Sequence, residues 1–261
     1  MSSLSKQWNH RAKLLGDSFS SVMEQSFPLA VTRVIHKVHL AEILDAIPSR
    51  AKRVLDVGCG WGRIAKEIVK RRQIEIEGID LSRHFVNLYN NQMKGKGRAT
   101  VADMRKIPFA TNSFDFVYCI VSLMYLSTLG DQKKGISEML RVIKPDGRLL
   151  FIEPNFWGVQ IVRLGGLITF VYRSLMGRPK VETGGIAFRI GVLRRIIEKS
   201  GGRIIRTKGY PFLTLVLLPA VAIGKISPST ARIILECASF FDRLFPMAFL
   251  SYFVTWEIIK K

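Results

Sequence analysis

The chain has 261 residues, 48% of them hydrophobic and 23% charged, and this balance excludes a disordered or fibrous protein. Forty lysines and arginines against 20 acidic residues give a formal charge of +20, which favours anionic partners such as nucleic acid, an acidic membrane surface or anionic metabolites. Cys59, Cys119 and Cys237 are far apart and form no CxxC or Cys/His spacing, so neither a disulfide framework nor a metal site is expected. The N-terminus has no continuous apolar stretch typical of a signal peptide, which predicts a cytoplasmic protein.

The first 155 residues predict a helical segment followed by an α/β core. Residues 1–50 are expected to be largely helical and to cover the functional site, and Pro48 ends this segment. From 51 to 155, short apolar runs alternate with polar helical stretches, and the runs are RVLDVG, EIEGID, RATVAD, FDFVYCIV and GRLLFIEP. That alternation is typical of a doubly wound, mostly parallel sheet with flanking helices.

Residues 156–261 differ in composition and are expected to select the substrate and to complete the sheet. The sequence GVLRRIIEKSGG predicts a helix, and RIIRTKG and SYFVTWEII predict two strands, which brings the sheet to seven. Between these strands lies an apolar insertion at about 211–250, expected to be helical. Its longest uncharged run, 209–224, has 16 residues, fewer than the roughly 18–20 that span a bilayer, so interfacial or lid helices are predicted.

The stretch VLDVGCGWGRIA, residues 54–65, joins the first strand to a glycine-rich turn. Such a turn can bind a dinucleotide pyrophosphate at a helix N-terminus. Here the spacing is Gly58-x-Gly60-x-Gly62, and Asp56 precedes the first glycine by two residues. A carboxylate repels phosphates and attracts a cation. S-adenosylmethionine carries an ammonium and a sulfonium group and no phosphate, so it fits this turn better.

Two further acidic residues end the next strands. Asp80 in GIDLS is placed to accept hydrogen bonds from both ribose hydroxyls. Asp103 in VADMRKIPF could accept one from the adenine amine, with Met104 packed on the ring. Each aspartate alone could merely cap a turn, but their succession after a GxGxG turn indicates an adenosine site.

With these motifs in order, the chain resembles a class I S-adenosylmethionine-dependent methyltransferase of the small-molecule or lipid type, closely over 51–155 and loosely over 191–210 and 251–259. The resemblance implies that Asp56 and the three glycines bind the methionine end, Asp80 the ribose and Asp103 the adenine. It also implies that Cys119 and Ile120 line the pocket near the methyl group. The predicted cofactor contacts are Asp56, Gly58, Cys59, Gly60, Gly62, Asp80, Leu81, Asp103, Met104, Cys119 and Ile120.

Methyl transfer is an in-line displacement in which a general base helps an ordinary hydroxyl to react. The two candidates at the carboxyl edge of the sheet are Tyr125 in SLMYL and Glu153 in FIEPN. Packing is the alternative role of Tyr125, and capping or positioning a neighbour is that of Glu153. Many relatives have a histidine in the SLMYL region, and this sequence has none.

The acceptor is predicted to be lipid-like or isoprenoid, for example a quinone precursor, because the apolar runs after residue 154 lie beside Arg163, Arg173, Arg178, Lys180 and Arg189. This pattern also predicts peripheral contact with an anionic membrane, at its inner face; a helical lid or dimer face is the alternative. An RNA methyltransferase remains open because of the charge, although no NPPY-like tetrapeptide follows the fourth strand. A non-catalytic cofactor-binding protein at a membrane is the third interpretation.

Overall fold

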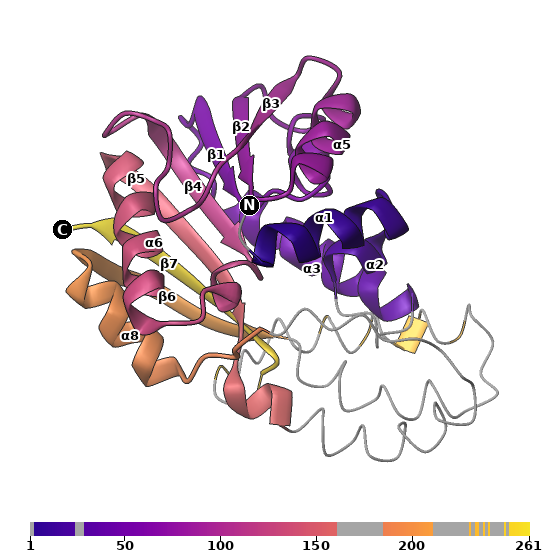
Figure 1. The fold of residues 1–261 in the computed structure, drawn as a ribbon. Coiled ribbons are helices and arrows are strands. Elements are labelled where there is room, and N and C mark those ends of the chain that lie inside the picture. The colour runs from indigo at the N-terminus through magenta and orange to yellow at the C-terminus, as the bar shows by residue number, and fades with distance from the viewer. Residues whose placement is uncertain are drawn as a thin grey trace.

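The computed structural model describes residues 3–23, 29–160, 185–210 and 251–261, together with residues 230, 233, 234, 237, 240 and 248. The predicted apolar insertion at about 211–250 therefore lies almost wholly outside the described residues. Figure 1 shows the helices and strands of the described ranges.

Seven strands of the described chain form one sheet in the order β3-β2-β1-β4-β5-β7-β6. Strand β7 is antiparallel to both of its neighbours, and the other pairings are parallel. The predicted mostly parallel, seven-stranded sheet is confirmed, including the final antiparallel pair. The strands are β1 Arg53–Val57, β2 Glu75–Asp80, β3 Gly97–Val101, β4 Phe114–Ile120, β5 Ile143–Pro154, β6 Gly202–Tyr210 and β7 Phe253–Lys260.

Helices cover both faces of the sheet because strand side chains alternate between the faces. Phe116 and Tyr118 of β4 belong to a core with α3, α4 and α5, whereas Val117 and Cys119 belong to a core with α6 and α8. The helices are α1 Ser3–Leu15, α2 Phe19–Val22, α3 Leu29–Ala46, α4 Ala65–Ile68, α5 Arg83–Met93, the 3₁₀ helix η1 Leu123–Tyr125, α6 Leu129–Val142 and α8 Ile190–Lys199. Three helices thus occupy the segment before Pro48, and α3 ends two residues before that proline.

The sheet order reverses between β1 and β4, where the chain leaves β1 toward β2 on one side and later returns through β4 on the other. In open α/β sheets, ligands bind in the crevice beyond the carboxyl ends of the strands at such a point. Helix α1 lies across this edge (Figure 1). The fold therefore places the glycine-rich turn after β1 and the segment after β4 side by side, beneath α1.

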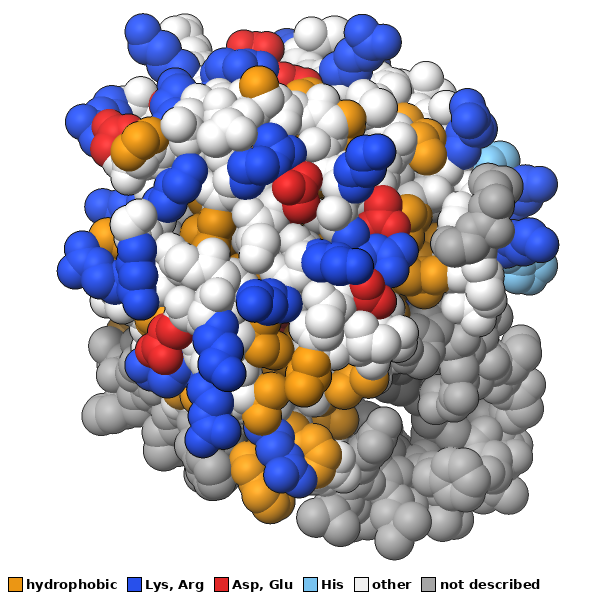
Figure 2. All heavy atoms as spheres, turned by 60° about the vertical axis from the view of Figure 1, so that its left-hand side comes forward, with side chains coloured by type: hydrophobic (Ala, Val, Ile, Leu, Met, Phe, Trp, Pro, Cys, Tyr) orange, Lys and Arg blue, Asp and Glu red, His pale blue; other side chains and the backbone are white. Residues whose placement is uncertain are grey.

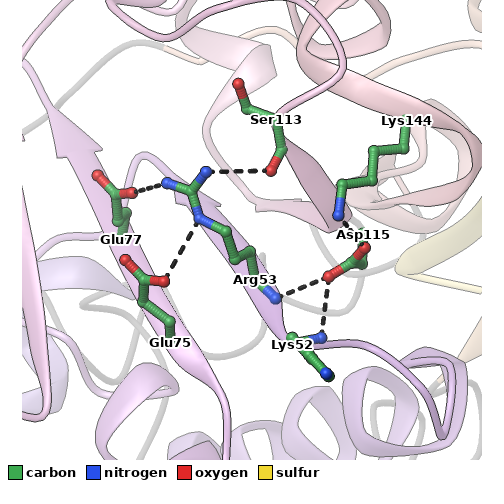
Figure 3. A network of polar contacts seen from close by, with 7 residues as sticks. All are labelled: Lys52, Arg53, Glu75, Glu77, Ser113, Asp115 and Lys144. Atoms are coloured by element: carbon green, nitrogen blue, oxygen red, sulfur yellow. Dashed lines mark hydrogen bonds and ion pairs between the residues drawn. The ribbon is translucent and has the colours of Figure 1, made fainter.

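A polar network joins the strands at the opposite edge of the sheet (Figure 3). The Asp115 carboxylate accepts from the backbone N–H groups of Lys52 and Arg53, at 2.9 and 2.8 Å, and from Lys144 Nζ at 2.6 Å. The Arg53 guanidinium pairs with Glu77 at 2.6 Å and with Glu75 at 3.4 Å. Burial opposes ionisation of Asp115, but the contacts from Lys144 and the two N–H groups bring its pKa below the ordinary value. These contacts fix the register of β1, β2 and β4 far from the crevice.

Candidate functional site

A pocket of about 820 Å³, part of it open to solvent, lies at the carboxyl edge of the sheet. Its lining comes from α1, the end of α2, the turn after β1, the ends of β2 and β3, the start of α5 and the segment after β4. The lining residues are Leu4, Trp8, Val22, Asp56, Gly58, Cys59, Gly60, Arg63, Ile64, Asp80, Leu81, Phe85, Asp103, Met104, Ile120, Val121, Ser122, Tyr125 and Leu126.

The glycine-rich turn forms one wall in a conformation that side chains disfavour. Gly58 and Gly60 have φ values of 73° and 52°, in the left-handed region. A Cβ on Gly58 would also collide with the side chain of Ser122, so the turn approaches the segment after β4 closely. The N–H of Gly60 donates to Asp80 Oδ2 at 2.9 Å, which joins the turn to the end of β2.

Asp56 is buried in the pocket wall, with 4% of its surface exposed. Its Oδ2 atom accepts from the Tyr118 hydroxyl at 2.7 Å. Burial raises the pKa of Asp56 to about 7, although the Tyr118 hydrogen bond and the nearby Arg63 both lower it. The apo pocket therefore contains a carboxyl group that a ligand cation would help to ionise.

Arg63 is a lining residue that the sequence analysis missed, and its side chain is buried. Its terminal nitrogens lie 3.2 Å from His36 Nδ1 and 3.0 Å from His39 Nδ1. Because arginine can only donate, both Nδ1 atoms act as acceptors, so the two histidines are neutral. Burial and Arg63 lower the pKa of His36 to about 4 and place that of His39 well below its ordinary value. Arg63 thus carries a positive charge at the pocket wall, and the two histidines beside it are uncharged.

The two aspartates after β2 and β3 both line the pocket, in different surroundings. Asp80 accepts from the N–H groups of Gly60 and Ser82, and burial raises its pKa to about 6 despite these bonds. Asp103 pairs with Arg105 at 2.6 Å, and although burial opposes it, this contact lowers the Asp103 pKa. The Asp103 carboxylate thus already binds Arg105, so an adenine amine would have to donate to this carboxylate beside that arginine.

Three predicted site residues, all within the described chain, do not line the pocket. Gly62 has φ 82° and packs under Tyr89 of α5, where a Cβ would stand 2.9 Å from that ring. Cys119 is fully buried on the face of β4 that packs toward α6. Glu153 is 1% exposed and accepts from backbone N–H groups of the segment after β4. The other nine predicted cofactor contacts and Tyr125 are on the wall.

Tyr125 lies in η1 and is partly exposed. Its ring packs edge-on against Trp8 of α1, with the centroids 4.9 Å apart. Helix α1 is fixed at this place by Asn9, whose Oδ1 accepts from Ser82 Oγ at 2.9 Å and from the N–H of His84 at 3.1 Å. Trp8 therefore closes the pocket opposite the strand ends. Helical periodicity around residue 8 predicts a helix but not its partner, so this contact could not be predicted.

Comparison with known proteins agrees with this geometry. Residues 54–147 match the family model described as a methyltransferase domain. The chain is 31% identical over 135 residues to O-methyltransferase rstn1 of Aspergillus nomiae, an alignment that covers 50% of this chain and 57% of that protein. It is 37% identical over 112 residues to the ubiquinone/menaquinone biosynthesis C-methyltransferase UbiE of Geobacter sulfurreducens, covering 40% and 43%. The chain thus spans about half the length of these curated relatives.

The fold agrees over a longer range. The crystal structure of geranyl diphosphate C-methyltransferase from Streptomyces coelicolor A3(2), solved with Mg²⁺, geranyl diphosphate and S-adenosyl-L-homocysteine, superposes with a TM-score of 0.62 at 16% identity. The superposition covers 99% of this chain and 97% of that one, which shows a common fold. Residues 54–147 are thus similar to a methyltransferase domain, and the chain shares the fold of a methyltransferase solved with S-adenosyl-L-homocysteine.

Proposed function

We propose that the protein transfers the methyl group of S-adenosylmethionine to a small lipid-like or isoprenoid acceptor. The observation that supports the acceptor class is the lining of the pocket. Beside the strand-end aspartates, Arg63 and Ser122, the wall is largely apolar, with Leu4, Trp8, Val22, Ile120, Val121 and Leu126 in it. Such a wall contributes binding energy through apolar burial and offers little to a charged acceptor.

The charged residues of the wall fit the zwitterionic end of the cofactor. Asp56 would accept from the α-ammonium group, and Arg63 would bind the carboxylate in the charge-assisted way that suits a guanidinium. Asp80 would accept from the ribose hydroxyls, and Asp103 from the adenine amine beside Arg105. Residues Gly58, Cys59, Gly60, Leu81, Met104 and Ile120 complete the proposed contacts on the wall.

When bound, the cofactor supplies a methyl group on a positively charged sulfur. Transfer would form a bond between the acceptor atom and that methyl carbon, in line with the carbon–sulfur bond that would break, and the acceptor would lose a proton. The chain's part is to align the two molecules and to exclude water. Tyr125 is the proposed group near the acceptor, because it lies on the wall, whereas Glu153 does not.

Support for the acceptor also comes from the relatives. UbiE acts in quinone biosynthesis by its name, and the Streptomyces enzyme was solved with geranyl diphosphate. The test is incubation of a cell extract with the protein and S-adenosylmethionine labelled in its methyl group. We expect label in the organic-soluble fraction, and none with Asp56→Ala. Label in RNA would replace this proposal by RNA methylation, and absence of transfer by a non-catalytic cofactor-binding role.

Peripheral contact with an anionic membrane is a second part of the proposal. Trp157 and Ile186 expose 47% and 51% of their surfaces, and Arg189, Arg194 and Arg195, which follow Ile186 in the sequence, are exposed as well. Figure 2 shows basic side chains spread over one face, with hydrophobic ones gathered toward its lower part. No helix of the described chain is long and apolar enough to cross a bilayer. Such a surface would bind at the interface through both apolar and basic groups.

Sedimentation with liposomes tests this contact. We expect retention on vesicles of phosphatidylglycerol at low salt, little on phosphatidylcholine, and a loss of retention in Trp157→Ser/Ile186→Ser. Arg50→Ser, a change of an exposed basic residue that pairs with Asp146, is the control. Equal binding of the control and the double variant, or no binding at all, would contradict the proposal.

A further inference from the structure

The segment that follows β4 has an unusual backbone. Val121 has a φ of 49°, in the left-handed region, although its side chain is β-branched. This conformation is unfavourable for valine and persists only where the surroundings impose it. Residues in such conformations are concentrated at functional sites, and Val121 lies on the pocket wall. A neighbouring group must therefore impose this turn.

The carboxylate of Glu153, on the neighbouring strand β5, lies directly behind this turn. Its Oε1 atom accepts from the N–H groups of Ser122 and Leu123, at 3.0 and 2.8 Å, and its Oε2 atom from that of Met124 at 3.3 Å. The first N–H groups of a helix have no partner within the helix. At η1 a single buried side chain therefore satisfies three consecutive N–H groups.

The parallel pairing of the strands puts Glu153 at this position. Ile120 of β4 is paired with Ile152 of β5, and the N–H of Val121 donates to the Ile152 carbonyl at 2.8 Å. The next residue of β5 is Glu153, so its side chain meets the chain just where β4 ends. A glutamate at this register position therefore supplies acceptors one residue beyond the last hydrogen bond between β4 and β5.

The turn positions two parts of the pocket. Ser122 packs against Gly58, so closely that a Cβ on this glycine would collide with it. Three residues further on, Tyr125 packs against Trp8 of α1. A displacement of the turn would therefore move the glycine-rich loop on one side and the aromatic pair on the other.

We propose that Glu153 is a positioning residue: by binding the N–H groups of residues 122–124, it fixes the left-handed turn after β4 and thereby the glycine-rich loop and Tyr125 in the pocket. This inference rests on the proposed function, since the pocket is taken to bind S-adenosylmethionine. It assigns Glu153 no contact with the substrate, which agrees with its absence from the wall.

Burial and the turn act in opposite directions on the ionisation of Glu153. Burial raises its pKa to about 8, and the three N–H groups oppose this rise. Of the other titratable groups, Cys119 is near, with its Sγ atom 4.0 Å from Oε1, and burial raises the pKa of that thiol as well. The N–H groups of the turn thus stabilise the carboxylate.

The test compares Glu153→Gln with Glu257→Gln. Glu257 is a second buried carboxylate of the same sheet, opposite Leu150 and paired with Arg206 at 2.6 Å, away from the turn. S-adenosylhomocysteine is the probe, titrated by calorimetry at a temperature where all variants are folded. We expect Glu153→Gln to weaken binding about tenfold, because the amide nitrogen of glutamine cannot accept a bond as the oxygen that it replaces does. Glu257→Gln should lower the melting temperature without changing the affinity.

Amide hydrogen exchange gives a readout that global destabilisation does not imitate. In Glu153→Gln, exchange should accelerate within the peptide 119–126 more than in β1, and in Glu257→Gln the two should change alike. If Glu153→Gln does not fold, Glu153→Asp, which keeps the carboxyl group but shortens the side chain, is expected to weaken binding about threefold.

The two proposals fail in different ways. Unchanged affinity in the Glu153 variants, or equal losses in the Glu153 and Glu257 variants, would overturn the positioning role while leaving the cofactor proposal intact. If the unsubstituted protein takes up no S-adenosylhomocysteine, the cofactor assignment fails first, and the exchange pattern of the apo protein still tests whether Glu153 fixes the turn.

Discussion

Asp56 combines burial with a pKa of about 7, so its protonation in the apo protein changes near neutral pH. The proposed partner is the α-ammonium group of the cofactor, which binds the ionised form. Below pH 7 binding must first release a proton, so affinity falls; above it, affinity reaches a plateau. We expect the dissociation constant of S-adenosylhomocysteine to rise up to about tenfold per pH unit as pH falls from 7 to 6. Calorimetry in several buffers also measures the proton released.

The variant Asp56→Asn isolates this group from its neighbours. Its affinity should be lower at pH 8 and nearly constant between pH 6.5 and 8, because the remaining raised carboxyl on the wall, Asp80, titrates at about 6. Tyr118 and Arg63, which both face Asp56, are unchanged in this variant. A pH dependence that persists in Asp56→Asn would assign the proton to another group.

A second prediction concerns the affinity of Arg63 variants for ligands with and without the amino-acid end of the cofactor. If its guanidinium binds the carboxylate, Arg63→Met should weaken S-adenosylhomocysteine at least about tenfold. Methylthioadenosine lacks the amino-acid end, so its affinity should change little. Arg71→Met, which removes an exposed arginine paired with Glu67, is the control for charge. Equal losses for both ligands would mean that Arg63 supports the pocket wall rather than the carboxylate.

At the scale of elements, helix α1 is the part of the pocket that the strands do not supply. Asn9 joins it to the start of α5, and Trp8 packs on Tyr125. Asn9→Ala removes the acceptor of two bonds, so we expect faster dissociation of S-adenosylhomocysteine with a smaller effect on association. Stopped-flow displacement measures both rates. Gln7→Ala, an exposed change on the same helix, should leave them unaltered; equal rates in both variants would contradict a closing role for α1.

The strands of this protein could be predicted because their signal is local. Apolar runs that end in Asp56 and Asp80 gave both the sheet and its functional edge, and the matched domain agrees. The position of Cys119 could also have been foreseen, since alternation puts it on the face opposite Tyr118. Gly62 fits the rule that the last glycine of such turns serves helix packing.

What the sequence could not predict depends on contacts between distant residues. Glu153 follows an apolar run, as Asp80 does. However, the register between β4 and β5 turns Glu153 toward the interior and the turn after β4. Arg63 became visible only through His36 and His39, whose spacing of three residues places them on one side of α3. Neither arrangement leaves a pattern in the order of residues.

At the scale of the whole molecule, two sets of carboxyl groups have opposite effects on stability. Asp115, Glu67 and Glu138 have lowered pKa values, so the stability they contribute is present above their unfolded pKa and lost as pH falls through the folded one. Asp56, Asp80 and Glu153 have pKa values raised to about 7, 6 and 8. Their contribution is present below the unfolded pKa and lost as pH rises through the folded one.

The apo protein should therefore lose stability toward pH 8, most steeply above about pH 6.5, because His36 and His39, whose pKa values are lowered, oppose the decline below that pH. Each raised carboxyl that stays protonated in the folded state contributes a slope of about 1.4 kcal/mol per pH unit. Urea unfolding at pH 5, 6, 7 and 8 measures it. Asp56→Asn should flatten the decline, whereas Asp115→Asn should destabilise most above pH 5. Saturating S-adenosylhomocysteine should reduce the decline in stability, because its ammonium group stabilises ionised Asp56. If neither the ligand nor Asp56→Asn changes the decline, the responsible charges lie outside the pocket.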